Sequence, residues 1–105
     1  MAIIVTLNSK QLTMLEFSKP LTDLEGNVVK DERGKDVLLS KVLASELAMS
    51  AKGDPLKYWD WAKKLSDGKP LELDPSDTST LKEFIKTNER LTIMPKAQML
   101  ELFKD

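Results

Sequence analysis

Two Asp-Pro pairs constrain the fold of this chain more than any other sequence feature, because each one marks the start of a helix. Asp54-Pro55 follows Lys52-Gly53, and Asp74-Pro75 follows a second break at Asp67-Gly68-Lys69-Pro70. Asp is a favoured N-cap residue, Pro fits the first helical position, and Gly is common just after a helix end. The spacing predicts one helix that ends before Gly53, a second over residues 55–66 and a third that starts at Pro75.

Apolar residues recur at helical spacing on both sides of these breaks. Leu39, Leu43 and Leu47 share one face of a predicted helix over residues 39–51. The helix is apolar around most of its circumference, so we expect it to be central to the core. The third helix, over residues 75–88, has a corresponding predicted stripe made of Leu81, Phe84 and Ile85.

The segments that flank the third helix are shorter. Leu71-Glu72-Leu73 is typical of an extended linker, and Leu91 to Met94 of an apolar connector. The residue before a proline favours an extended backbone, so we expect the last helix to begin at Pro95 and to end near Phe103.

The N-terminal third has the pattern of strands and turns. Ile3, Val5 and Leu7 alternate with their neighbours in a predicted strand over residues 2–7, and residues 12–17 are a second strand candidate. Together they predict a β-hairpin.

A short internal echo follows this hairpin. Residues 23–30 and 31–38 each place a glycine, Gly26 or Gly34, where a turn needs a positive φ, and each then returns to Val. The second unit predicts another hairpin, with its turn over residues 31–34. Two copies are too few for a repeat protein.

These patterns predict an α+β fold dominated by helix. One or more N-terminal β-hairpins precede a small bundle of three to four short helices. A chain of 105 residues has the size of one domain, so we expect a single domain over residues 1–105, with a strand and turn region at 1–36 and a helical region at 37–105.

The residue inventory argues against an enzyme. The chain has no His and no Cys, and Tyr58 is its only Tyr, which excludes Ser-His-Asp, Cys-His and His-metal chemistry. The nearest acidic cluster is Glu72, Asp74 and Asp77, but Asp74 has a capping role and Asp77 falls in the first turn of a helix. The four glycines are isolated and form no phosphate-binding loop. We therefore predict no catalytic residues, no cofactor and no metal site.

The charge balance argues against nucleic acid and membranes. Sixteen Lys and Arg against 17 Asp and Glu give a net charge of −1, which provides no overall attraction to polyanions. No apolar stretch approaches the roughly 20 residues of a membrane span. The N-terminus has no basic region ahead of its apolar run, so we expect a cytoplasmic protein without a secretion signal.

The aromatic cluster of residues 58–61 is the strongest candidate for binding. On a helical wheel Tyr58 and Trp61 share the apolar face, Trp59 lies at its edge, and Leu56 is nearly opposite. Trp59 is therefore either a half-buried flank of the core or part of a contact patch with Leu56 and Lys63, since Trp is enriched at interface hot spots.

The terminal helix offers a second candidate surface. Its Leu100 and Phe103 are expected in the core. Met99 and Leu102 either join them or form an exposed strip for a partner, because Met adapts to varied surfaces. The candidate partner-contact residues are thus Leu56, Trp59, Lys63, Met99 and Leu102.

Several segments of the chain resemble small uncharacterised proteins encoded by tailed bacteriophages and bacterial prophages. The resemblance covers most of the chain from Leu21 onward and brings no residues of known function with it. It implies the cytoplasm of an infected bacterium as the setting and a protein–protein role. The matching segments are Glu25-Gly26-Asn27, Leu39 to Ala44, Lys52 to Pro55, Lys57 to Ala62, Lys64-Leu65, Leu71 to Asp74, Leu81-Lys82 and Ala97 to Glu101.

Two functions fit the sequence. The first is a non-enzymatic phage or prophage accessory protein that binds a protein partner or itself, in particle assembly or host takeover. The second is a small DNA-binding regulator of the helix-turn-helix type, in which the third helix reads DNA through Lys82, Lys86 and Arg90. Nearby acidic residues, Glu83 and Glu89 among them, weigh against the second.

Overall fold

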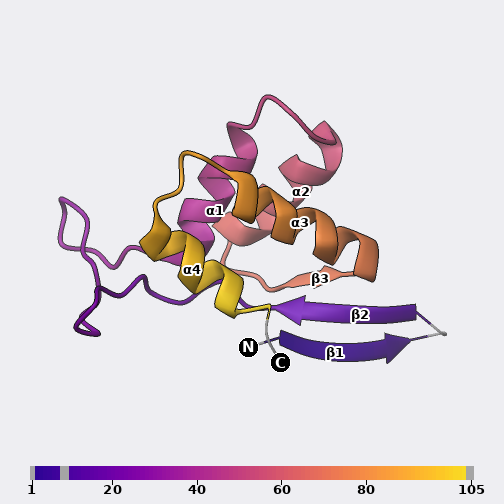
Figure 1. Ribbon diagram of the computed structural model, residues 1–105, viewed down its shortest axis with the longest axis horizontal. Coiled ribbons are helices and arrows are strands. Elements are labelled where there is room, and N and C mark those ends of the chain that lie inside the picture. Colours follow the sequence, from indigo (N-terminus) through magenta and orange to yellow (C-terminus); the bar gives the residue numbers. More distant parts are fainter. Residues whose placement is uncertain (1, 8–9, 104–105) are drawn as a thin grey trace. The chain divides into compact units, whose positions relative to one another are not determined.

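The computed structural model describes residues 2–7 and 10–103, with side chains from residue 12 onward (Figure 1). Its elements run in the order β1-β2-α1-α2-β3-α3-α4. The predicted α+β fold, dominated by helix, is confirmed. Contacts divide the chain into two compact units, residues 1–16 with 70–105, and residues 17–69. The prediction of a single domain remains a prediction, and the two units are described separately.

The first unit contains a three-stranded antiparallel sheet in the order β1-β2-β3. The predicted N-terminal hairpin is present as β1 (Ala2–Leu7) and β2 (Lys10–Leu15). The apolar face predicted for residues 2–7 lies outside the described side chains. The segment expected to be a linker is strand β3 (Leu71–Leu73), which pairs with β2 so that Leu15 faces Leu71.

Helix α3 (Pro75–Thr87) packs on β2 and β3. The Asp74 side chain accepts a hydrogen bond from the Asp77 backbone N–H at 2.7 Å, which confirms the predicted N-cap. Leu81 and Ile85 are fully buried, as the apolar spacing predicts, and Phe84 is half-buried.

Helix α4 (Ile93–Glu101) begins two residues before the expected start at Pro95. The expectation failed because Pro95 occupies the third position of the helix. The first four N–H groups of a helix have no intrahelical partner, so the missing N–H of a proline there breaks no hydrogen bond. Ile93 and Met94 are therefore helical, not part of an extended connector.

The second unit begins with a ring of three short segments, each centred on one apolar residue. The Leu21 N–H donates to the Val37 carbonyl at 2.7 Å, Val37 to Val29 at 2.9 Å, and Val29 back to Leu21 at 2.8 Å. These three residues are spaced by eight, which is the period of the internal echo in the sequence. The hairpin predicted over residues 28–38 is present within the ring as an isolated antiparallel bridge between Lys30 and Asp36 and the Val37–Val29 hydrogen bond, with its turn at residues 31–34. The segment around Leu21, which the sequence did not predict, pairs with both arms of this hairpin.

Two similar turns connect the segments of this ring. The Asp23 carboxylate accepts hydrogen bonds from the Glu25 and Asn27 N–H groups, both at 2.9 Å. Asp31 accepts from Arg33 and Lys35 at 2.8 and 3.0 Å in the same way. The predicted positive φ at the glycine of each turn is confirmed, at 86° and 79°.

Helix α1 (Leu39–Ala48) follows the ring and has no side-chain cap at its N-terminus. Its first two N–H groups, of Leu39 and Ser40, donate instead to the backbone carbonyls of Lys19 and Phe17, at 2.9 and 2.8 Å. The predicted stripe of Leu39, Leu43 and Leu47 is buried. The helix ends three residues before the expected end at residue 51, and Met49 and Ala51 are exposed, so it is less central than predicted.

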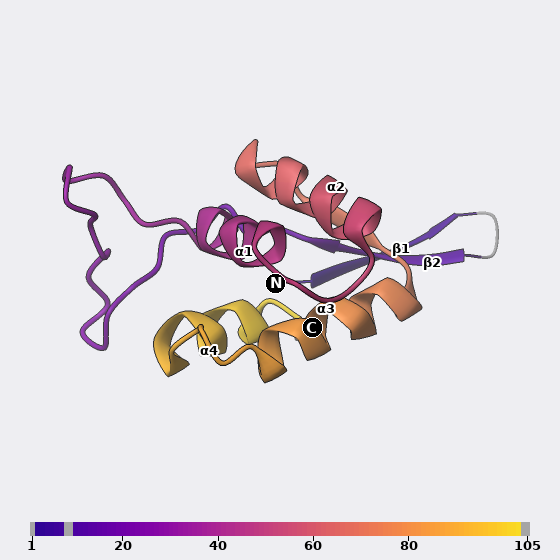
Figure 2. The same ribbon diagram turned by 90° about the horizontal axis from the view of Figure 1, so that it is seen from above.

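Helix α2 (Pro55–Ser66) has the predicted bounds and packs against α1 (Figure 2). Asp54 caps it as expected, since one carboxylate oxygen accepts from the Leu56 and Lys57 N–H groups, both at 3.1 Å. Lys41 near the start of α1 donates to the Ser66 carbonyl at the end of α2, at 2.7 Å. The two helices therefore run in opposite directions.

Candidate protein-contact surface

Helix α2 has one buried face and one exposed apolar face. Trp61, Ala62 and Leu65 are buried. Leu56 is 83% exposed and Trp59 is 55% exposed. At 3.6 residues per turn, Leu56, Trp59 and Lys63 fall within an arc of about 60°. We call these three residues the α2 outer face, and sequence reasoning had brought the same three together.

The aromatic residues of α2 are divided between the two faces. Tyr58 and Trp61 stack, with ring centroids 5.6 Å apart and planes 21° apart. Trp61 is buried and Tyr58 is half-buried, whereas most of the Trp59 side chain is exposed. An exposure of 55% is compatible with both sequence interpretations of Trp59, the half-buried flank of the core and the contact patch.

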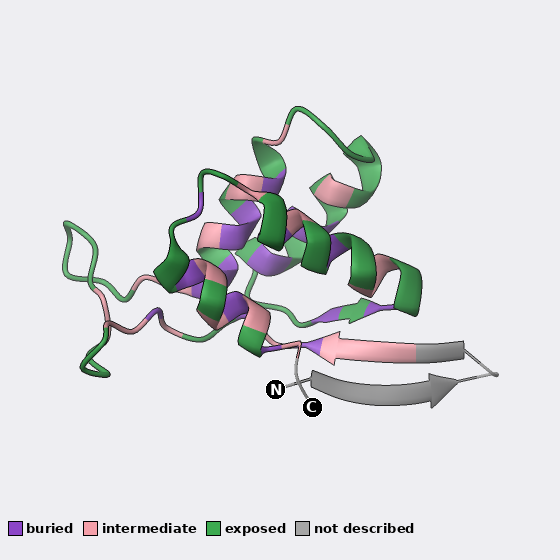
Figure 3. Cartoon of the chain, in the orientation of Figure 1, coloured by how far each residue is buried: buried purple, intermediate pink, exposed green. Residues whose placement is uncertain are grey.

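A cleft of about 400 Å³ adjoins the outer face. Trp59 belongs to both, because it lines the cleft and lies on the outer face. The connection between α1 and α2 and the start of α2 are largely exposed (Figure 3). The other residues that line the cleft are Leu47, Ala48, Ser50, Ala51, Lys52, Gly53, Pro55 and Tyr58.

Two residues that line the cleft, Gly53 and Tyr58, approach each other closely. A Cβ atom at Gly53 would lie 2.5 Å from two carbons of the Tyr58 ring, and the φ of Gly53 is 103°. Only glycine fits this combination without strain. The sequence predicted that Gly53 follows directly on the end of α1, but α1 ends at Ala48. Gly53 instead brings the α1–α2 connection against the Tyr58 ring of α2.

The charges around the outer face are partly engaged. The Asp54 carboxylate is held by the backbone at the start of α2, and Asp60 forms an ion pair with Lys64 at 3.0 Å. Lys52 and Lys63 are exposed, and within the part of the chain that the structure describes neither forms an ion pair.

The second candidate surface, on α4, is not present as expected. Met99 is fully buried and Leu102 is 6% exposed, so the exposed strip is wrong. With Pro95 they lie at positions i, i+4 and i+7, which is one face of a helix, and that face is the buried one. Leu100 and Phe103, which the sequence placed in the core, are half-buried.

Four other large apolar residues among those described are exposed at positions that the sequence analysis did not single out. Ile93 is 79% exposed and Met94 36% exposed in the first turn of α4, where an extended connector was expected. Leu24 is fully exposed in the first turn of the ring, and Met49 is 51% exposed at the end of α1.

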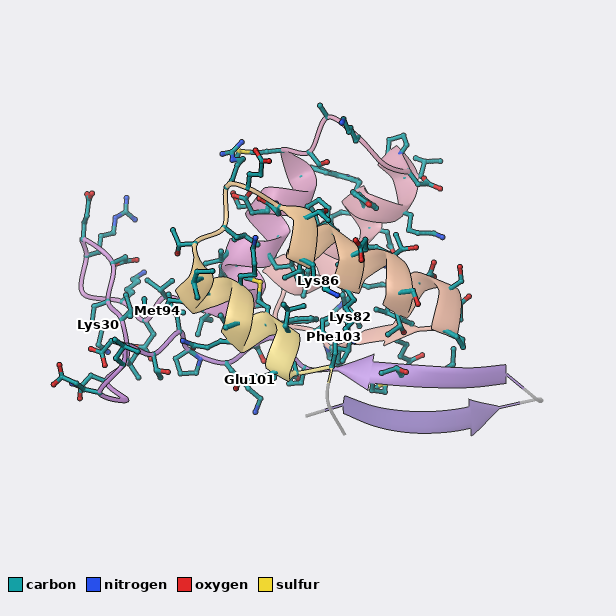
Figure 4. All side chains as sticks on the ribbon, in the orientation of Figure 1. Lys30, Lys82, Lys86, Met94, Glu101 and Phe103 are labelled. Atoms are coloured by element: carbon teal, nitrogen blue, oxygen red, sulfur yellow. The ribbon has the colours of Figure 1, made fainter. Side chains whose placement is uncertain are left out.

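The residues proposed to read DNA do not share one helix. Lys82 and Lys86 are exposed on α3 (Figure 4), but α3 ends at Thr87 and Arg90 lies in the connection that follows. The expectation that all three lie on one side of a helix is therefore wrong. The Lys96 ammonium donates to the Lys86 carbonyl at 3.3 Å, so a cation from α4 lies beside the end of α3.

Over residues 2–7 and 10–103, no group of three or more Asp or Glu side chains is placed to hold a metal ion. Nor does any helix in the described part of the chain have the length and apolar character needed to cross a membrane.

Comparison of the chain with family models, curated proteins and solved structures finds no match.

Proposed function

We propose that this chain is a non-enzymatic accessory protein that binds another protein through the α2 outer face and the adjoining cleft. The observation that carries the proposal is Trp59, a large aromatic side chain that is 55% exposed at the edge of the buried face of α2. Trp contributes more than most residues to binding energy when a partner buries it.

Exposure of one apolar residue alone does not mark an interface, since scattered apolar residues are common on protein surfaces. Here Leu56, at 83% exposure, lies one helical turn before Trp59, and Trp59 also lines the cleft. The exposed Leu56 side chain, the Trp59 ring and the adjoining cleft together offer a partner both contact area and a shaped surface.

The residue inventory supports a binding role over a catalytic one. The chain has neither His nor Cys, the side chains that most often serve as bases and nucleophiles near neutral pH. The phage or prophage setting, with a role in particle assembly or host takeover in the bacterial cytoplasm, rests on the sequence resemblance described above.

A photo-crosslinking amino acid at position 59 tests the proposal in cells. We expect irradiation of the bacterium that carries the gene to join position 59 of the full-length chain to one defined protein. The matched control places the same amino acid at Ser79, which is exposed on α3 and outside the proposed surface. Equal products from positions 59 and 79, or none from position 59, would contradict the proposal.

A further inference from the structure

We infer that the α2 outer face and its cleft bind an acidic amphipathic peptide segment of the partner, in which Asp or Glu residues flank an aliphatic or aromatic anchor. This inference rests on the proposed function and adds the chemistry of the segment that is bound.

The charges near Trp59 that have no partner among the described residues are positive. Both acidic groups on this part of α2 are engaged, Asp54 by two backbone N–H groups and Asp60 by Lys64. Near Trp59 the exposed charges that remain are Lys52, which lines the cleft, and Lys63, one turn beyond Trp59. Asp67, the next exposed charge on this side, lies at the far end of α2, two turns from Trp59. The surface therefore presents two cations near an exposed aromatic ring, one in the cleft and one on the outer face, and a complementary partner carries carboxylates at these two places.

The cleft offers a binding place for an apolar side chain of the partner. Leu47, Ala48 and Pro55 line the cleft beside the Trp59 ring. An opening of about 400 Å³ has room for one or two apolar side chains but not for a folded element. This fits a short segment with one anchor better than a broad flat interface.

Single-stranded nucleic acid is the other anionic ligand that combines with aromatic and basic residues. Such binding uses several exposed rings on which successive bases stack. On α2 only Trp59 is largely exposed, since Trp61 is buried and Tyr58 is half-buried and stacked on it. A surface with one largely exposed ring, beside Leu56 and the aliphatic lining of the cleft, favours a peptide.

Selection of peptides from a random display library on the full-length chain tests the inference, with Trp59→Ala as the counter-selection. We expect enriched peptides to combine Asp or Glu with an apolar anchor. The affinity of a recovered peptide, measured by fluorescence polarisation, should be about 10-fold or more lower for K52E/K63E than for the parent chain. This difference in affinity should shrink at high salt.

The charge-matched control is R33E/K35E, which also changes two cations to Glu, in the second turn of the ring, far from the start of α2 in both views (Figures 1 and 2). We expect affinity there to stay within about 2-fold of the parent chain.

Three results would overturn the inference. The selection could yield neutral or basic peptides that bind through Trp59 and have the same affinity for K52E/K63E as for the parent chain. That result would refute the acidic segment and leave the proposed function in place. Binding of single-stranded oligothymidine that depends on Trp59 would assign the surface to nucleic acid. A selection in which no peptide distinguishes Trp59→Ala from the parent would refute the inference and count against the proposed function as well.

Discussion

Gly53 meets two separate demands at one residue, a backbone φ of 103° and close contact with the Tyr58 ring. Gly53→Ala should lower the free energy of unfolding by about 3–4 kcal/mol, the sum of the backbone cost and the overpacking. The Tyr58 ring cannot simply move away, because it stacks on Trp61. Urea denaturation measures the change.

Gly26→Ala is the control for this prediction. Gly26 also has a positive φ, 86°, but no atom lies within 4 Å of the position its Cβ would take. We expect only the backbone cost there, about 1–2 kcal/mol. If both variants lose the same stability, the contact between Gly53 and Tyr58 does not exist as described.

Single positions on α2 were predictable because the helix was. Once Asp54-Pro55 fixed its start, the wheel placed Trp61 inward and Leu56 outward, as observed. The same reasoning failed on α4 for a local reason. Pro95 predicts the start of a helix, but it is the third residue of α4. Its position therefore did not indicate that Ile93 and Met94 are exposed helical residues.

Strand β3 has only three residues, but it pairs with β2 and contributes two buried leucines to the first unit. Leu73 is 1% exposed and its backbone partner is Thr13 on β2. Leu73→Ala should lower the free energy of unfolding by about 2–5 kcal/mol, as expected for a buried Leu.

Glu72→Ala, on the exposed side of the same strand, should change stability by no more than about 0.5 kcal/mol. Thermal or chemical unfolding of both variants gives the comparison. A small effect at both positions would return residues 71–73 to the role of a linker.

Elements with local signals were predicted better than elements made by distant contacts. Residues 55–66 and 75–87 carry their own Asp caps and prolines. The start of α1 has no such signal, because its free N–H groups are satisfied by carbonyls about 20 residues earlier in the chain. The ring around Leu21 and the pairing of β3 with β2 likewise depend on contacts that apolar periodicity cannot show.

At the scale of the whole molecule, the two compact units do not follow the predicted boundary between residues 36 and 37. The first unit combines residues 1–16 with residues 70–105, because β2 pairs with β3. The whole second unit lies between these two strands in the sequence. Sequence patterns are read along the chain, so they gave no sign of this division.

The predicted single domain can be tested by unfolding with two probes. Both tryptophans belong to the second unit, whereas circular dichroism follows the helices of both units. We expect coincident urea transitions, because a chain of this length usually unfolds cooperatively. A fluorescence transition separated from the dichroism transition would show that the units unfold independently.

The two tryptophans of α2 have different roles in the proposed function: Trp61 stabilises the fold, and Trp59 binds the partner. The most direct test is the free energy of unfolding of Trp59→Ala and Trp61→Ala, measured by urea denaturation. We predict a loss of about 3–5 kcal/mol for Trp61→Ala, which removes a buried ring. For Trp59→Ala we predict a loss of less than about 2 kcal/mol, in proportion to the smaller area that its ring buries. A loss for Trp59→Ala as large as that for Trp61→Ala would place Trp59 in the core and contradict the proposed surface.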